Sequence, residues 1–174
     1  MNASKQGLAV WITGLPASGK STVAAALAAE LRSRSVPVEV LESDALRKVF
    51  TPRPRYDEEE REAFYGQIAY LGALLARHGV AVIFDATANR RAYRDRAREQ
   101  IPRFIEVYVD TPLEVCMRRD PKGIFGRGGT VPGLHVPYEA PLDPDLVIHG
   151  DREPPEIAAR RIIASLIDSG TISG

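Results

Sequence analysis

Gly14-Leu15-Pro16-Ala17-Ser18-Gly19-Lys20-Ser21 matches the pattern G-x-x-x-x-G-K-[ST] at every fixed position. Residues 8–13 before it are apolar and rich in β-forming side chains, and residues 21–31 after it read as an alanine-rich helix. A strand, a glycine-containing loop and a helix in this order are the context in which the pattern binds phosphate. We therefore expect this loop to hold the phosphates of a nucleoside triphosphate such as ATP.

The residue types in this loop suit phosphate binding. Glycines at 14 and 19 allow a tight turn in which backbone N–H groups point at phosphate oxygens, beside the positive end of the helix. We expect Lys20 to reach the β- and γ-phosphates and the Ser21 hydroxyl to coordinate Mg²⁺. Thr22 is either a second phosphate contact or an ordinary helix residue. The predicted nucleotide contacts in the loop are Gly14, Leu15, Pro16, Ala17, Ser18, Gly19, Lys20, Ser21 and Thr22.

Length and composition restrict the class of protein. The chain has 174 residues, with 23 Lys plus Arg against 23 Asp plus Glu, so no net field attracts nucleic acid or an anionic membrane. This length favours a single P-loop domain over residues 1–174. Cys116 is the only cysteine, which excludes an intramolecular disulfide and favours a packed thiol. Residues 1–7 lack the apolar core of a signal peptide, so we expect a cytoplasmic protein, and a homodimer stays open.

Strand patterns and helical patterns alternate along the chain. Strands are predicted at 8–13, 38–41, 80–84, 104–109 and 146–148, and helices at 21–31, 44–50, 57–78, 90–100, from 112, and at 154–169. Asp57 is placed to cap the longest helix. The alternation predicts a three-layer α/β/α P-loop fold with a five-stranded parallel sheet covered on both faces. Ligands then bind at the carboxyl ends of the strands.

Proline and glycine gather in residues 121–137, which show no regular periodicity and form a long connection for a compact domain. We expect this segment to be a mobile lid that excludes water, or else a surface loop with solubilising charges. Arg119 and Lys122 lie beside and within it. Closure of the lid would bring both cations over the triphosphate.

The second half of the chain contains four runs that occur in the same order in a known family: residues 104–116, 119–123, 138–141 and 144–146. Residues 41–47, Leu41-Glu42-Ser43-Asp44-Ala45-Leu46-Arg47, are similar to that family's Asp-Gly-Asp-Asn-x-Arg signature. With the phosphate-binding loop, these runs resemble the adenylylsulfate kinases. That family uses MgATP to phosphorylate the ribose 3′-hydroxyl of adenosine 5′-phosphosulfate, so the resemblance implies ATP, Mg²⁺ and a small acceptor with an anionic group.

The resemblance also implies roles for individual side chains. Asp44 would lie beside the acceptor hydroxyl, and Arg47 would hold the anionic group of the acceptor. Arg61 matches the arginine of the family's Arg-x-x-Asn motif, whereas Phe64 stands where the family has Asn. Arg119 would lie on the nucleotide side of the site.

The chain departs from the family after the third predicted strand. Asp85-Ala86-Thr87-Ala88-Asn89 replaces the usual Ile-Ser-Pro and looks more like polynucleotide-kinase and zeta-toxin relatives. The loop after Gly123 is also shorter and lacks the family's Phe-Thr-Gly element. Transfer to another hydroxyl compound, such as a sugar, a nucleoside or an antibiotic, is therefore an alternative. A nucleotide-binding regulator without transfer activity is a second alternative.

Phosphoryl transfer requires alignment, positive charge and a carboxylate that accepts the hydroxyl proton. Asp44 is the first candidate for this base, although Asp is also a common helix cap. Asp85 resembles the acid that orients Mg²⁺ and would otherwise be a turn residue. The predicted catalytic residues are Asp44, Lys20 and Asp85, and the predicted metal contacts are Ser21, Asp44 and Asp85.

The predicted acceptor contacts are mostly cationic. Arg90 and Arg94 lie one helical turn apart near a strand end, although a solvated helix face is the competing interpretation. Arginine suits phosphate or sulfate because its planar group binds two oxygens at once. Tyr56 either stacks on an acceptor base or packs on the long helix. The full set of predicted acceptor contacts is Arg47, Arg61, Arg90, Arg94, Tyr56 and Lys122.

Overall fold

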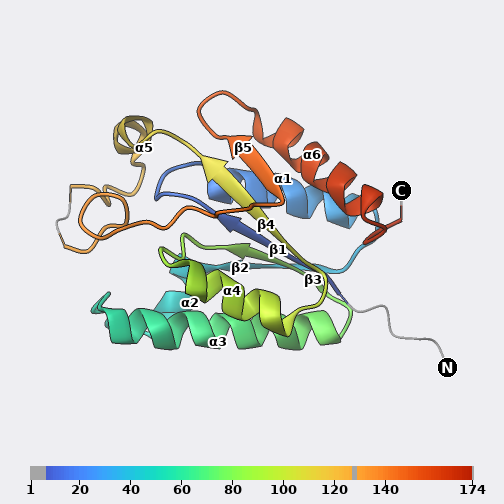
Figure 1. The fold of residues 1–174 in the computed structure, drawn as a ribbon, viewed down its shortest axis with the longest axis horizontal. Helices are drawn as coiled ribbons and strands as arrows, with labels where there is room; N and C mark the ends of the chain where they lie inside the picture. Colours follow the sequence, from blue (N-terminus) through green and yellow to red (C-terminus); the bar gives the residue numbers. More distant parts are fainter. Residues whose placement is uncertain (1–6, 127–128, 174) are drawn as a thin grey trace.

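The computed structural model describes residues 7–126 and 129–173, and the strands in these ranges form one five-stranded sheet (Figure 1). The strands are β1 (Ala9–Thr13), β2 (Val38–Glu42), β3 (Ala81–Asp85), β4 (Phe104–Asp110) and β5 (Leu146–His149). Their order in the sheet is β2-β3-β1-β4-β5, and every pair is parallel. The predicted five-stranded parallel sheet is confirmed.

Helices cover both faces of the sheet, as predicted. They are α1 (Lys20–Ser33), α2 (Ser43–Phe50), α3 (Glu58–Arg77), α4 (Arg91–Gln100), α5 (Leu113–Arg119) and α6 (Pro155–Asp168). Figure 1 shows α1 and α6 on one face and α3 and α4 on the other. The Asp57 carboxylate caps α3 by accepting the N–H of Glu60 at 2.9 Å. No helix in the described ranges is long and apolar enough to cross a membrane.

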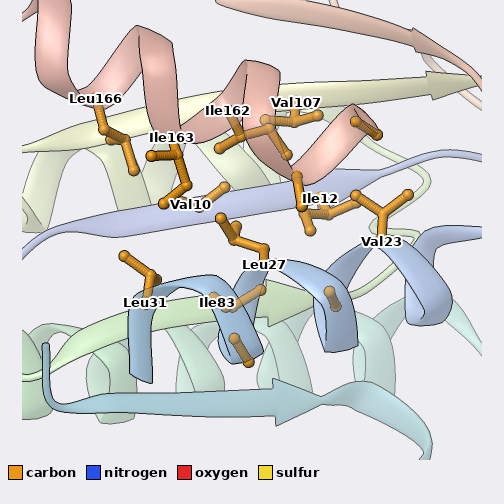
Figure 2. Packing of buried hydrophobic residues seen from close by; sticks show 14 of the residues in the cluster. Val10, Ile12, Val23, Leu27, Leu31, Ile83, Val107, Ile162, Ile163 and Leu166 are labelled. Carbon is orange, nitrogen blue, oxygen red and sulfur yellow. The ribbon is translucent and has the colours of Figure 1, made fainter. Parts of the chain in front are cut away.

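The central strand β1 is buried on both faces because its side chains alternate between the two helical layers. Figure 2 shows Val10 and Ile12 between Leu27 of α1 and Ile162 of α6. The alternate residue Trp11 points to the opposite layer, where its ring stacks on Phe84 at a centroid distance of 4.4 Å. Two apolar layers therefore hold the sheet rigidly in place.

The register of the strands brings their carboxyl ends to one edge of the sheet. Ile12 of β1 and Glu42 of β2 are both in register with Asp85 of β3, and Asp110 of β4 is in register with His149 of β5. The strands in Figure 1 point toward the side on which α2 and α5 lie. Loops that are far apart in the sequence therefore meet at this edge, as expected for a parallel sheet.

Helix α3 approaches the sheet closely because Gly72 has no side chain. A Cβ atom at Gly72 would lie 2.2 Å from Cζ of Phe84, which no normal contact allows. Gly66 lies in the same helix, but a Cβ atom there would meet only the flexible end of Arg96, at 3.0 Å. Comparing alanine substitutions at these two glycines thus separates the effect of core packing from that of helix propensity.

We predict that Gly72→Ala lowers the free energy of unfolding by about 1–3 kcal/mol, because the added methyl group overpacks the core. Gly66→Ala is the matched control, and it should be neutral or stabilising by up to about 1 kcal/mol through helix propensity. Urea unfolding followed by circular dichroism measures both changes. Equal changes in the two variants would contradict the close packing of α3 on Phe84.

Candidate functional site

The loop between β1 and α1 has the backbone conformation that phosphate binding requires. Gly14 and Gly19 have φ angles of +155° and +105°, and Ala17 between them has a φ of +59°. A Cβ atom at Gly14 would also lie 2.6 Å from the carbonyl oxygen of Val109. Only glycine fits at position 14, because both the φ angle and the contact with β4 exclude a side chain.

The N-terminus of α1 is open to an anion. Gly19 precedes the helix without a side-chain cap, and its first turn contains no acidic residue. The N–H groups of the first turn therefore face the loop without a competing carboxylate. Together with the positive end of the helix dipole, they form an anion-binding site.

Lys20 is a buried cation at this helix end, with 8% of its surface exposed. Its Nζ donates a hydrogen bond to the carbonyl oxygen of Leu15 at 2.7 Å. Burial lowers the pKa of Lys20, and the negative charge of Asp85 partly opposes this effect. The ammonium group is thus held by a neutral loop carbonyl and only partly compensated by Asp85, so phosphate oxygens would complete the compensation of its charge.

Asp85 and Ser21 provide oxygen atoms beside Lys20. Burial raises the pKa of Asp85, whereas the charge of Lys20 and a hydrogen bond with Ser21 oppose the increase. A carboxylate and a hydroxyl are the oxygen ligands that Mg²⁺ accepts. Within residues 7–126 and 129–173, no group of three or more His, Cys, Asp or Glu side chains can hold a metal ion alone. The residues therefore fit a Mg²⁺ ion that keeps several waters and shares phosphate oxygens.

A cleft of about 470 Å³ opens over the loop, and we call it the loop cleft. Both candidate carboxylates, Asp44 and Asp85, line it. The predicted nucleotide contacts that line it are Pro16, Ala17, Gly19, Lys20, Ser21, Thr22 and Arg119, whereas Gly14, Leu15 and Ser18 do not. Arg119 borders it from α5, and its Nη1 donates a hydrogen bond to the carbonyl oxygen of Gly150 at 2.8 Å. The candidate functional residues among its lining are Gly19, Lys20, Ser21, Thr22, Asp44, Asp85, Arg119 and Lys122.

A second cleft of about 880 Å³ adjoins the first, and we call it the arginine cleft. Arg47, Tyr56 and Arg61 line it. The two clefts share the wall formed by Asp44 and Lys122. The structure thus brings together the candidate base, the phosphate loop and four of the six predicted acceptor contacts, Arg47, Tyr56, Arg61 and Lys122.

Asp44 and Lys122 form an ion pair at the junction of the clefts. Lys122 Nζ lies 2.6 Å from Oδ2 of Asp44 and 3.5 Å from Oε1 of Glu42. The hydrogen bond to Asp44 raises the pKa of Lys122. About half of each side chain is exposed, so the pair can open when a ligand competes for either partner.

The two arginines of the arginine cleft have different partners. Arg47 forms a buried ion pair with Glu60 at 2.7 Å, and its guanidinium lies 4.0 Å from the ring centre of Phe64. Arg61 instead donates to neutral oxygens, Oδ1 of Asn89 at 3.2 Å and the carbonyl oxygen of Thr130 at 2.6 Å. Burial lowers the pKa of Arg61.

Arg61 is 7% exposed and forms no ion pair with any residue that the structure describes. A buried guanidinium without a carboxylate is costly unless an anion reaches it. Phe64 is completely buried beneath Arg47, which explains how a phenyl ring occupies a position where the resemblance implied Asn. Arg61 is therefore the strongest candidate for an anion contact in the arginine cleft.

Arg90 and Arg94 do not line either cleft. Arg94 is 1% exposed; its Nε lies 2.5 Å from Oε1 of Glu106, and its two terminal nitrogens donate to the carbonyl oxygens of Ala88 and Glu139. Arg90 pairs with the exposed Glu58 at 2.6 Å. Arg94 therefore holds the backbone behind the site in place and is not one of the side chains that face the acceptor cleft.

Tyr56 is placed at the mouth of the arginine cleft. Its ring centre lies 5.0 Å from the guanidinium carbon of Arg47, and 44% of its surface is exposed. Its backbone has a φ angle of +58°, which is unfavourable for a tyrosine. The adjacent amide groups of Arg55 and Tyr56 both donate to the Glu60 carboxylate, which holds this turn in place.

The described part of the predicted lid lies against both clefts. Thr130 receives the hydrogen bond of Arg61, and a Cβ atom at Gly133 would lie 2.5 Å from Cδ2 of Leu15. Tyr138 directly follows the lid, and its hydroxyl is 2.9 Å from Oγ1 of Thr13. Residues 127 and 128 of the predicted lid lie outside the described residues.

Several residues of the site were missed at the level of sequence. Glu60 fixes Arg47, Thr87 lines both clefts, and Asn89 and Thr130 hold Arg61. Two signals pointed to Asn89: its position after β3 at the binding edge of the sheet, and its place in the Asp85-Ala86-Thr87-Ala88-Asn89 run that departs from the family. The partners of the other residues come from elements distant in sequence.

Comparison with known proteins gives a consistent result. The family model of adenylylsulphate kinase matches residues 6–149. An adenylyl-sulfate kinase of Synechococcus sp. is 41% identical over 149 residues, which cover 83% of this chain and 85% of the relative. A probable bifunctional SAT/APS kinase of Sorangium cellulosum is 38% identical over 95% of this chain, which spans 29% of that longer relative.

A solved structure extends the similarity to three dimensions. The Mycobacterium tuberculosis APS kinase in complex with AMPPNP and APS aligns with a TM-score of 0.86 at 32% identity. The alignment covers 92% of this chain and 98% of that chain. The layered fold and the order of its elements are therefore shared over nearly the whole length of both proteins.

We predict that Lys20→Met abolishes stabilisation by MgATP without lowering the stability of the free chain. Because burial lowers the pKa of Lys20, the ammonium costs the folded state free energy at neutral pH, and Met removes that cost. The gain in stability should disappear as the pH rises past 10.5, the usual pKa of lysine, because the unfolded chain then also loses the charge.

Thermal unfolding with and without MgATP measures this effect. Nucleotide at a hundredfold excess over its Kd should stabilise the wild type by about 2.7 kcal/mol and leave the variant unchanged. Lys48→Met, which changes an exposed lysine outside the loop cleft, is the control and should keep the stabilisation. An equal effect of MgATP on Lys20→Met and wild type would exclude Lys20 from nucleotide binding.

Proposed function

Because this chain belongs to the adenylylsulfate kinase family, we propose that it transfers the γ-phosphoryl group of MgATP to the 3′-hydroxyl of adenosine 5′-phosphosulfate. The observation that carries this proposal is the junction of the loop cleft and the arginine cleft at Asp44 and Lys122. Direct transfer requires donor and acceptor to lie side by side with a carboxylate at the acceptor hydroxyl.

The loop cleft provides the donor site. The open N-terminus of α1 and the buried ammonium of Lys20 bind the triphosphate. Ser21 and Asp85 would hold Mg²⁺, which would neutralise charge on the phosphates of the donor. Arg119 lies at the rim of this cleft, and we assign it to the binding of the nucleotide.

Asp44 acts at the boundary between donor and acceptor. Its carboxylate accepts the proton of the 3′-hydroxyl as the new oxygen–phosphorus bond forms and the bond to the β-phosphate breaks. In the structure the Asp44 carboxylate forms an ion pair with Lys122, so this ion pair must open before transfer. The freed ammonium group then lies over the phosphoryl group, where its charge favours the transition state.

The arginine cleft provides the acceptor site, and its volume of about 880 Å³ suits a nucleotide-sized ligand. Arg61 binds the phosphosulfate because its charge is uncompensated within the described chain. Arg47 is already paired with Glu60, so it contributes orientation and a smaller net charge. Tyr56 covers the base at the mouth of the cleft.

An assay of ADP release tests the proposed function. The purified chain is supplied with MgATP and either adenosine 5′-phosphosulfate or a panel of sugars, nucleosides and hydroxyl-bearing antibiotics. We expect turnover well above slow ATP hydrolysis only with adenosine 5′-phosphosulfate. Faster turnover with a member of the panel would identify that compound, rather than adenosine 5′-phosphosulfate, as the acceptor. Tight MgATP binding without any turnover would favour a nucleotide-binding regulator.

We predict that Asp44→Asn lowers turnover by about 10²–10⁴-fold because the amide cannot accept the hydroxyl proton. The Kd of MgATP should change little, since the phosphate loop and Lys20 remain intact. Asp95→Asn, which changes an exposed carboxylate of α4 outside both clefts, is the control and should keep full turnover. Wild-type turnover in Asp44→Asn would remove this residue from the mechanism.

A further inference from the structure

Asn89 forms hydrogen bonds that connect separate segments around the arginine cleft. It is 7% exposed, lines the arginine cleft and follows β3. Its Oδ1 accepts the hydrogen bond of Arg61 at 3.2 Å, and its Nδ2 donates to the carbonyl oxygen of Pro137 at 3.2 Å. The backbone oxygen of Asn89 accepts the N–H of Glu139 at 2.8 Å. One amide therefore links α3, the loop after β3 and the end of the lid.

We propose that Asn89 is a positioning residue that aims Arg61 at the anionic group of the acceptor and, being neutral, leaves the charge of Arg61 uncompensated. This inference rests on the proposed function and extends it to a residue outside the predicted contacts. It assigns to Asn89 an effect on acceptor affinity that is exerted through Arg61.

The partners of Asn89 fix the orientation of its amide. A guanidinium can only donate, so the group facing Arg61 must be the oxygen. The carbonyl of Pro137 can only accept, so the group facing it must be the nitrogen. Both ends of the amide are thus used in one orientation, and no 180° flip preserves both hydrogen bonds.

The backbone before Asn89 is strained, and neighbouring side chains hold it. Ala88 has a φ angle of +43°, in the left-handed region that is unfavourable for alanine. Its N–H donates to the Tyr65 hydroxyl at 3.1 Å, and its carbonyl oxygen accepts from Arg94 Nη1 at 2.5 Å. Such strain persists where the surroundings enforce it, and it concentrates at functional sites. Here it directs the side chain of the next residue toward Arg61.

Other arginines near the site show what a carboxylate would do in place of Asn89. Glu60 pairs with Arg47, and Glu106 pairs with Arg94, so both charges are compensated within the chain. Among the residues that the structure describes, Arg61 donates only to the Asn89 side-chain oxygen and to the two oxygens of Thr130. The neutral amide therefore orients a buried cation while leaving its field available to an incoming anion.

Asn89→Asp tests whether the side chain at position 89 must be neutral. The aspartate keeps an oxygen toward Arg61 and adds a negative charge. The Kd of adenosine 5′-phosphosulfate, measured by calorimetry, should rise by about tenfold or more because the carboxylate compensates Arg61 and repels the ligand. The Kd of MgATP should stay within about twofold of the wild type. Unchanged binding of adenosine 5′-phosphosulfate would overturn the inference.

Asn89→Ser supplies a second variant in case the aspartate prevents folding, which circular dichroism and thermal unfolding would reveal. The hydroxyl is neutral and can still accept a hydrogen bond, so the loss of acceptor affinity should be smaller than in Asn89→Asp. If serine weakens binding as strongly as aspartate, charge is not the property that matters at position 89.

A double-mutant cycle separates an effect through Arg61 from a general structural effect. In an Arg61→Met background, adding Asn89→Asp should change the Kd of adenosine 5′-phosphosulfate by less than about twofold, because the charge that it compensates is gone. Additive losses in the double variant would show that Asn89 acts independently of Arg61 and would contradict the proposal.

Failure of the proposed function gives a different result from failure of this inference. If the wild type does not bind adenosine 5′-phosphosulfate, the acceptor is wrong, and the cycle is repeated with inorganic sulfate at constant ionic strength. Sulfate should then raise the thermal stability of the wild type by more than that of Asn89→Asp or Arg61→Met, because sulfate binding at the phosphate loop is common to all three proteins. Equal stabilisation of all three proteins would overturn the role of Asn89 whatever the true acceptor is.

Discussion

Two buried cations at the carboxyl edge of the sheet determine how this site works. Lys20 contacts the carbonyl oxygen of Leu15, and Arg61 contacts Asn89 and Thr130, so neutral oxygens hold both groups in place. Arg61 forms no ion pair with a described residue, and Asp85 offsets the burial of Lys20 only in part. Burial of these charges is therefore costly, and an anionic ligand recovers that cost on binding. The parallel sheet makes the arrangement possible because its register brings the loops after β1 and β3 to one edge. Binding of a triphosphate and an anionic acceptor thus supplies the negative charge that compensates these two buried cations.

The layered fold was predictable because its signals are local in sequence. The apolar run of β1, the glycine loop and the alanine-rich α1 follow one another directly, and Asp57 caps α3 as its position suggested. The strands were recognisable because both faces of the sheet are buried, which leaves nearly continuous apolar runs. Predicted boundaries lie within one residue of those in the structure, except that α1 ends two residues later than predicted.

The partners of the charged residues could not be predicted in the same way. Helical spacing places Arg90 and Arg94 one turn apart, at the N-cap and in the first turns of α4, but does not reveal that Glu106 of β4 pairs with Arg94. The same limit applies to Arg47, whose charge Glu60 compensates. Asn89 depends on the left-handed backbone of Ala88, which nothing in the local sequence requires. These contacts join elements that are separated along the chain, so only the folded structure shows which arginine remains uncompensated.

A crystal structure with a non-hydrolysable MgATP analogue and adenosine 5′-phosphosulfate tests the central claim most directly. The account predicts terminal phosphates against Lys20, the phosphosulfate against Arg61, and the 3′-hydroxyl within hydrogen-bond distance of Asp44. It also predicts that Lys122 has left Asp44 and moved toward the γ-phosphate. An acceptor whose anionic group lies away from Arg61, or whose hydroxyl lies out of reach of Asp44, would contradict the account.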